Sequence, residues 1–379
     1  MKIRQLEAWP IRLPRDLASA TGTAGSPTKL AGTGEGYRWS AVYPCLYSTQ
    51  FETALVRVTL ENGLSGWGEA QAPLAPEVPC EIVRQLLRPA LEGAEFDGTR
   101  ACLERLWHRM YSTMRVRGQT GGFMLDAISG VDLALWDLAG KLAQKPVFEL
   151  LGGWRTKLAA YVSGLAAEGR LEAAERYRGE GFDQFKLFFD TPGEAEFLEL
   201  LDGLPAGCRF AVDALWRFDL AAAQRFGLEL DARQALWFEA PLPPEDAQEH
   251  GKLAASIATP VALGESYRTR YEIAPFVREG AVEVFQPDLG RCGITEGLRM
   301  AALVQAPVVP HVSIAMGPQI AAALHFASAL RNCTLVEYNP QVVALANHFL
   351  REPIEIAGGC YQVPQGPGLG IDLKADLLP

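Results

Sequence analysis

The sequence has little that would favour binding to a polyanion. Its 379 residues include 35 Lys and Arg against 45 Asp and Glu, a formal net charge of −10 with His neutral, and no segment is rich in basic residues. Binding to nucleic acid or to an anionic membrane depends on the attraction of basic side chains to phosphates. We therefore expect neither partner. An anionic substrate would need local cations or a metal ion to overcome the overall negative charge.

Features of secreted and membrane proteins are also scarce. The seven cysteines, an odd number, include no Cys-x-x-Cys pair, which favours reduced thiols in a cytoplasmic protein over a disulfide framework or a zinc site. The start MKIRQLEAWP lacks an apolar segment, so no signal peptide is expected. Residues 301–330 contain no Asp, Glu, Lys or Arg, but Pro307, Pro310, Gly317 and Pro318 interrupt them. We expect a buried strand, a loop and a buried helix there rather than a membrane span.

The N-terminal third predicts an α+β unit. The length exceeds that of one ordinary domain, and 49% hydrophobic with 21% charged residues is typical of a globular protein. Residues 1–14 and 51–70 predict strands, the second segment containing a hairpin turn at Glu61-Asn62-Gly63. Residues 78–115 predict helices.

A long loop over residues 15–50 separates the two strand segments. It is rich in Gly, Ser and Thr and contains several aromatic residues. Loops of this length are either functional or disordered. We interpret this one as a lid over a site, with Arg38, Trp39 and Tyr43 as candidate substrate contacts; the alternative is a disordered insertion.

A helix and then a repeating pattern follow. The apolar residues Ile128, Val131, Leu135, Leu138 and Leu142 recur at steps of three and four, which predicts one buried helix face. Further on, a short apolar run followed by a helix-like stretch occurs eight times, the runs being AAYVSG, QFKLF, CRFAVDA, LWFEA, PVALGE, VEVFQPD, PVVPH and TLVEY. Eight such units with parallel strands close into a (β/α)₈ barrel, an α/β fold.

The terminal polar residue of each of the last seven runs, at or near the end of the run, is ionisable. These residues recur at intervals of 23 to 27 and are Lys186, Asp213, Glu239, Glu265, Asp288, His311 and Glu337. Active sites of such barrels lie at the carboxyl ends of the strands. We therefore expect all seven side chains at one mouth of the barrel.

Asp213, Glu239 and Glu265 end three consecutive strands. Three converging carboxylates repel one another unless a cation lies between them, and Mg²⁺ prefers carboxylate oxygens. No Cys or His joins the set, which disfavours zinc. We interpret the three acids as ligands of Mg²⁺; the alternative is a set of salt bridges to Lys or Arg.

Asp288 and His311 end neighbouring strands. A carboxylate beside a histidine fixes its tautomer and raises its basicity, which suits a general base. Lys186 is either a cation for a substrate carboxylate and proton transfer or an ordinary lysine with its charge in solvent. Glu337 is either a protonated hydrogen-bond donor to an enolate or the partner of a lysine at the mouth.

These residues resemble the enolase superfamily, in particular its mandelate racemase and muconate lactonizing enzyme branch. The motifs that carry the resemblance are VDLALWDLAGK with LLGG, then VDA, WFEAPLPPED, GESY, FQPDLGRCG, VPH and VEY. The resemblance implies an N-terminal α+β capping domain (1–124), a (β/α)₇β barrel (125–350) and a C-terminal segment (351–379) that returns to the capping domain. It also implies Mg²⁺ on Asp213, Glu239 and Glu265, a His311–Asp288 dyad and a last-strand Glu337.

Two positions depart from the family pattern. Phe188 stands where the family has the second lysine of Lys-x-Lys, which is a base on the opposite face of the substrate. Leu215 stands where Asn often follows Asp-Ala, and Trp216 and Arg217 next to it are expected near the pocket. With one base, a racemase or epimerase is disfavoured.

The resemblance therefore implies a Mg²⁺-dependent hydro-lyase that removes water from a sugar acid, with His311 as the single acid/base group. The alternatives are a cycloisomerase or lactone-processing enzyme of the same superfamily, an epimerase, and a silent sugar-acid-binding protein. The expected partners are a small carboxylate substrate and further copies of the chain in a homo-oligomer.

Overall fold

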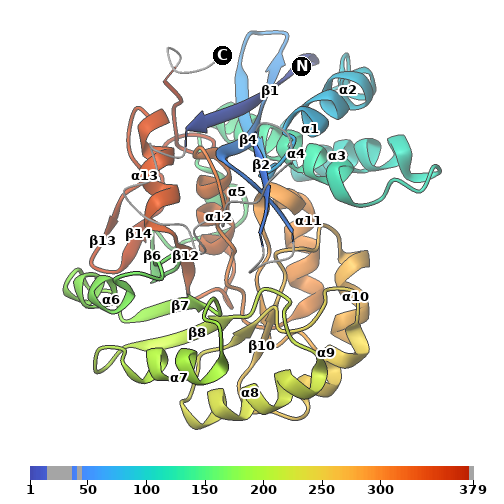
Figure 1. The fold of residues 1–379 in the computed structure, drawn as a ribbon. Helices are drawn as coiled ribbons and strands as arrows, with labels where there is room; N and C mark the ends of the chain where they lie inside the picture. Colours follow the sequence, from blue (N-terminus) through green and yellow to red (C-terminus); the bar gives the residue numbers. More distant parts are fainter. Residues whose placement is uncertain (15–35, 41–44, 375–379) are drawn as a thin grey trace.

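The computed structural model describes residues 1–14, 36–40 and 45–374. The predicted N-terminal strands are confirmed as an antiparallel three-stranded sheet in the order β1–β4–β5. Its strands are β1 (Ile3–Pro14), β4 (Gln50–Leu60) and β5 (Ser65–Ala70). The turn at Glu61-Asn62-Gly63 joins β4 to β5, as its sequence predicts. Figure 1 shows this sheet above the larger one.

Helices follow the small sheet, as predicted for residues 78–115. They are α1 (Glu77–Ile82), η2 (Val83–Leu87), α2 (Arg88–Leu91) and α3 (Arg100–Arg115). The Thr99 side chain caps α3 by accepting a hydrogen bond from Cys102 N.

Within the predicted lid, the described residues form a short β-hairpin. It pairs β2 (Tyr37–Trp39) with β3 (Leu46–Ser48). The buried carboxylate of Glu52 fixes its base by accepting hydrogen bonds from Ser48 Oγ and Tyr37 OH. Arg38 and Trp39 lie in β2, whereas Tyr43 and residues 15–35 lie outside the described residues.

The long helix α4 (Gly122–Ala143) is buried along most of its length and packs on β5 and β4. Ile128, Val131, Leu135 and Leu138 are buried and Leu142 half-buried, which confirms the predicted apolar face. The close approach of α4 to β5 depends on Gly66 and Gly68. A Cβ on Gly68 would overlap the carbonyl oxygen of Gly130 and lie 2.6 Å from Ala134 N.

Gly68→Ala is therefore expected to lower the free energy of unfolding by about 3 kcal/mol, because the obstructing atoms belong to the helix backbone. Chemical denaturation measures it. The control is Gly179→Ala in α6, where the new Cβ meets no atom within 4 Å outside its chain neighbours and the backbone of its own helix. Equal stability of the two variants would contradict the close packing.

The second part of the chain alternates strands with helices. Its strands are β6 (Lys157–Val162), β7 (Gln184–Phe188), β8 (Arg209–Asp213), β9 (Phe238–Glu239), β10 (Val261–Leu263), β11 (Val284–Phe285) and β12 (Val336–Tyr338). Its helices are α5 (Val147–Leu150), α6 (Arg170–Gly179), α7 (Glu194–Asp202), α8 (Leu220–Ala232), α9 (Ala247–Ala254), α10 (Arg270–Arg278), α11 (Leu289–Val304), α12 (Pro318–Ala329) and α13 (Pro340–Phe349). The strands pair in parallel in chain order from β6 to β11, and β12 pairs in parallel with β6.

The run PVVPH at 307–311 does not form the regular strand that was predicted. It makes only isolated bridges, from Val308 to Phe285 and Cys333 and from His311 to Asp288. The reason is that Pro307 and Pro310 have no amide N–H to donate to a ladder. These bridges still place the run between β11 and the segment that leads into β12.

The C-terminal segment contacts both parts of the chain. Strand β13 (Ile356–Ala357) forms a hairpin with β14 (Cys360–Gln362), and β14 pairs antiparallel with β6. Gly368 lies against α4, where Leu369 N donates to Asp137 Oδ1 at 2.8 Å.

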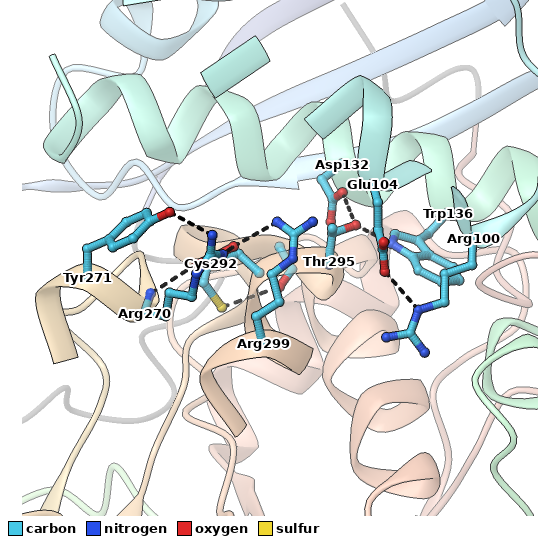
Figure 2. A network of polar contacts seen from close by, with 11 residues as sticks. Arg100, Glu104, Asp132, Trp136, Arg270, Tyr271, Cys292, Thr295 and Arg299 are labelled. Carbon is cyan, nitrogen blue, oxygen red and sulfur yellow. Dashed lines mark hydrogen bonds and ion pairs between the residues drawn. The ribbon is translucent and has the colours of Figure 1, made fainter. Parts of the chain in front are cut away.

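Helices α4 and α11 are joined by buried polar contacts, several of which are drawn in Figure 2. Thr295 N and Oγ1 donate to the buried Asp132 carboxylate, and Trp136 Nε1 donates to Thr295 Oγ1 at 2.9 Å. On the same helix, the fully buried Glu296 accepts from Arg270 and Arg299. The contacts of Thr295 hold α11, and with it Asp288 at its N-terminus, against α4, whereas the Arg270–Glu296 contact joins α11 to α10.

No helix in the described ranges has both the length and the apolar character needed to cross a membrane. Residues 301–330 fold into the end of α11, the bridged run and α12, so the expected buried helix is confirmed and the expected strand is not regular. All seven cysteines are free thiols.

Candidate active site

The ionisable residues that end the apolar runs come together at one edge of the large sheet. Phe188, Asp213 and Glu239 are register neighbours on the adjacent parallel strands β7, β8 and β9. Glu265 follows β10 by two residues, and Glu337 lies in β12. The parallel register thus confirms that the strand ends meet.

The ammonium group of Lys186 lies between the carboxylates of three of these acids. Its Nζ lies 2.6 Å from Glu239 Oε1, 3.1 Å from Glu337 Oε1 and 3.4 Å from Asp213 Oδ2. All four side chains are almost completely buried. Burial alone would lower the pKa of Lys186, but the carboxylates of Glu239 and Glu337 raise it above its usual value. Lys186 is therefore a buried ammonium ion, not a lysine with its charge in solvent.

The same contacts decide the charge of Glu337. Although burial raises the pKa of a carboxyl group, Lys186 and His311 outweigh it, and the pKa of Glu337 is lowered. Glu337 also accepts a hydrogen bond from Val312 N at 2.9 Å. This favours the lysine-partner interpretation of Glu337 over the protonated donor.

His311 is held between two carboxylates. Its Nδ1 lies 2.8 Å from Asp288 Oδ2 and its Nε2 lies 3.0 Å from Glu265 Oε2. Burial lowers the pKa of His311, but Glu265, Glu337 and Asp288 together raise it to about 9. Asp288 is itself fixed, because Gly290 N and Gln319 Nε2 donate to its Oδ1. The predicted His311–Asp288 dyad is thus present as a geometric pair.

The three acids predicted as metal ligands form contacts with cations of the chain. Lys186 bridges Asp213 and Glu239, and His311 pairs with Glu265. Among the described residues, no three Asp, Glu, His or Cys side chains are gathered as ligands of one metal ion.

The charge balance nevertheless fits a hard divalent cation. Five carboxylates (Asp213, Glu239, Glu265, Asp288 and Glu337) face one lysine and one histidine, so negative charge exceeds positive charge even when His311 is protonated. Burial and the neighbouring Glu239 raise the pKa of Asp213 well above its usual value. A divalent cation bound to carboxylate oxygens would relieve this repulsion.

A cavity of about 510 Å³ opens beside His311 and Glu265. Its lining includes Leu46, Tyr47 and Ser48 of β3 as well as Leu215 and Trp216, so the described hairpin and the segment after β8 both reach it. Leu215 and Trp216 have φ of 52° and 60°, a left-handed conformation that favours Gly or Asn over these residues.

The other predicted contacts within the described residues are not part of the lining of this cavity. Trp39 is 46% exposed, and neither Arg38 nor Trp39 belongs to the lining. Phe188 is half-buried at the end of β7, and its ring centroid lies 5.5 Å from Lys186 Nζ. Arg217 donates to the Phe189 carbonyl oxygen instead of reaching the cavity.

Residues that the sequence did not single out support the dyad from the small sheet. Glu69 of β5 is fully buried and accepts hydrogen bonds from Met316 N, Gln319 N and Thr53 Oγ1. Gln319 in turn donates to Asp288. The only sequence signal for Glu69 is a glutamate within the mostly apolar strand SGWGEA. The spacing of apolar residues does not show what such a glutamate contacts.

Burial raises the pKa of Glu69 from 4.5 to about 7, with a smaller contribution from Asp288. A folded-state pKa above the unfolded value adds stability below about pH 4.5, and this contribution is lost as the pH rises through 7. Relative to Glu69→Gln, the wild type is expected to lose about 2 kcal/mol of unfolding free energy between pH 5 and pH 8.

Urea denaturation at the two pH values measures this difference. Glu61→Gln in the exposed β4–β5 turn is the matched control, because its carboxylate is in solvent in both states. Parallel pH profiles for the wild type and Glu69→Gln would show that Glu69 titrates normally.

The geometry defines a class of protein: an α/β protein whose parallel strands end in acids, a lysine and a histidine around one cavity, with a smaller α+β unit contributing to its wall. Two family patterns match the chain. The mandelate racemase/muconate lactonizing enzyme N-terminal domain matches residues 46–152, and the enolase C-terminal domain-like family matches residues 169–377. The chain therefore belongs to the mandelate racemase/muconate lactonizing enzyme branch of the enolase superfamily, as its motifs predict.

Individual relatives agree with this assignment. The chain is 32% identical to D-galactarolactone cycloisomerase of Agrobacterium fabrum, over 86% of this chain and 89% of that protein. It is 30% identical to arabinonate dehydratase of Saccharolobus solfataricus, over 85% of this chain and 88% of that protein. A solved enolase superfamily member from Agrobacterium tumefaciens superposes with a TM-score of 0.89 at 30% identity, covering 99% of this chain and 97% of that one.

Proposed function

We propose that this protein removes the proton α to the carboxylate of a sugar acid and then eliminates the β-hydroxyl as water. The observation that carries the proposal is His311, whose Nδ1 is fixed by Asp288 and whose Nε2 side lines the cavity next to Glu265. Relatives named as sugar acid dehydratases and a cycloisomerase support this reaction type.

Asp213, Glu239 and Glu265 are proposed to hold Mg²⁺. The excess of buried carboxylates in this cluster supports it. When bound, the ion would bind the substrate carboxylate and stabilise negative charge on the enediolate.

The residues of the chain then divide the proton chemistry. Asp288 is proposed to hold the proton on His311 Nδ1. In this structure Glu265 pairs with Nε2 and raises the pKa of His311; if Glu265 instead held the metal ion, this contribution would fall and Nε2 would be free to accept the α-proton. The imidazolium formed at Nε2 returns that proton to the leaving hydroxyl, so that water departs and His311 is neutral again. Lys186, held by three acids and outside the cavity lining, is proposed to offset part of their negative charge.

We propose that proton transfer takes place on one face of the substrate only, because a second candidate base on the opposite face is missing. Phe188 takes the position of the family's second lysine and cannot accept a proton, and Lys186 is already paired with Glu239, Glu337 and Asp213. An epimerase needs a base on each face of the substrate. A dehydratase needs only one.

A cycloisomerase is the second candidate, favoured by the likeness to D-galactarolactone cycloisomerase. It uses the same α-proton chemistry without releasing water. Incubation of the protein with Mg²⁺ and a panel of sugar acids and their lactones, followed by semicarbazide detection, separates the candidates. A keto acid formed from a free sugar acid supports the dehydratase; conversion of lactones alone supports the cycloisomerase. Ligand binding without turnover on either class would support the silent binder.

Several wider features stay proposals. We propose that the parallel strands form the (β/α)₇β barrel of residues 125–350, capped by residues 1–124 and bordered by residues 351–379. The pairing of β12 with β6 and the bridges at Val308 support the barrel. A homo-oligomer and a cytoplasmic location are proposed with it, the latter on the seven free thiols.

A further inference from the structure

Arg291 is a cation near the dyad that forms no ion pair with an acid in the described residues. It lies in the first turn of α11 and is half-buried, and it lines the cavity together with His311. Its Nε is buried without a hydrogen-bond partner, and its guanidinium forms no ion pair with any residue in the described part of the chain. Removing a guanidinium from water without a partner costs free energy, so an unpaired arginine in a cavity wall points to an anionic ligand.

The acids nearest to Arg291 already have other partners. Asp126 accepts from Arg268 Nε at 2.7 Å and Nη2 at 3.2 Å. Asp288, three residues before Arg291, accepts from His311, Gln319 and Gly290 N. The acids in the described part of the chain therefore leave the guanidinium of Arg291 without a direct partner, available to a ligand in the cavity.

Gln71 provides a second unmatched polar group in the same place. Its side chain is 2% exposed, it lines the cavity, and its Oε1 has no hydrogen-bond partner. The Gln71 backbone N donates to Gly290 O at 2.8 Å, and Ser129 Oγ donates to the same oxygen. Gln71 is thus fixed beside the residue that precedes Arg291, although the two come from the N-terminal unit and the large-sheet unit.

The side chains that line the cavity limit the chemical class of ligand that fits. Arg291 and His311 are the cationic groups of the lining within the described residues. The one carboxylate of the described lining, Glu265, is paired with His311 Nε2 at 3.0 Å, which leaves Arg291 as the unpaired charge. A guanidinium fork binds a carboxylate through two parallel hydrogen bonds. Gln71 Nε2 can add a donor without charge, and its unpartnered Oε1 can accept a hydrogen bond from a hydroxyl of the same ligand. One cation and one amide match a singly charged carboxylate better than a doubly charged phosphate.

We propose that Arg291 and Gln71 bind a second carboxylate of the substrate, at the end remote from the reacting carbon. The substrate is then a dicarboxylic sugar acid, or its monolactone with one free carboxylate. This inference rests on the proposed function, because the acid cluster and His311 are assigned there to the reacting carboxylate end.

The test compares matched substrates that differ at one carbon. Each dicarboxylic acid of a C4–C6 panel is paired with the monocarboxylic acid of the same stereochemistry, which carries a CH₂OH in place of the second carboxylate. The wild type is expected to prefer the diacid by about 100-fold in kcat/KM, since a charge-assisted bidentate pair would be lost with the monoacid. Both Arg291→Gln and Gln71→Leu are expected to reduce this preference. In Arg291→Gln the kcat/KM values for diacid and monoacid are expected to differ by no more than about threefold.

Arg331→Gln is the control, since it removes the same charge from an exposed loop before β12 and should keep the diacid preference. Calorimetric binding of the same pairs to His311→Asn, with and without Arg291→Gln, gives a measure that needs no turnover. Equal use or binding of diacid and monoacid by the wild type overturns the second carboxylate, even when the proposed reaction proceeds. Tight, Arg291-dependent binding of diacids without any turnover supports the subsite and overturns the proposed function instead.

Discussion

His311→Asn is expected to lower kcat on the best sugar acid by about 1,000-fold or more. Asn preserves a hydrogen-bond donor toward Asp288 but has no nitrogen that accepts a proton, and a positioned general base contributes about 10²- to 10⁴-fold. Because His311 also donates that proton back to the leaving hydroxyl, the two steps fail together. Steady-state keto acid formation measures the effect.

His348→Asn is the matched control, since His348 is exposed on α13, away from the cavity lining. Unchanged circular dichroism and denaturation midpoints would establish that both variants are folded. Activity of His311→Asn above one tenth of the wild type would place the base elsewhere.

Glu239→Gln is expected to weaken Mg²⁺ binding at least 100-fold and to lower turnover by about 1,000-fold. Glu239 is 1% exposed and holds three donors at once: Lys186 Nζ, Trp237 Nε1 and Gln286 Nε2. The amide keeps the size of the side chain but removes one of the three proposed anionic ligands, and a hard cation depends on that charge. Calorimetric titration with Mg²⁺ measures the binding without substrate.

The control for this variant is Glu199→Gln, which removes the charge of an exposed acid on α7 that makes no contact with the cluster. Lys186 retains Asp213 and Glu337 in Glu239→Gln, so the variant is expected to fold. Mg²⁺ affinity equal to that of the control would contradict Glu239 as a ligand.

The strand ends could be predicted because their signal is local. Asp213 and Glu239 each close a short apolar run, and the regular spacing of the runs fixes which residues face one another across parallel strands. The same reasoning failed for 307–311, where two prolines prevent a regular ladder although the run is apolar. The His311–Asp288 pair could also be predicted from the sequence, because Asp288 and His311 close neighbouring apolar runs.

Contacts between distant segments could not be predicted in this way. Glu69 bonds to Met316 N across 247 positions of sequence, and Gln71 meets Gly290 from the other part of the chain. Neither belongs to a periodic pattern, since both are polar residues in mostly apolar surroundings. The sequence also did not decide whether Mg²⁺ or Lys186 neutralises the acids at the strand ends. Either cation can bind the same carboxylates, so the residue types alone are compatible with both.

The central claim is that His311 abstracts a proton α to a carboxylate. The most direct measurement follows the α-hydrogen of sugar acids by proton NMR in D₂O with Mg²⁺, using the wild type and His311→Asn. The account predicts that the wild type removes the α-hydrogen of at least one acid and that His311→Asn leaves it in place. An α-hydrogen retained by the wild type with every acid it binds, or removed equally fast by His311→Asn, would contradict the account.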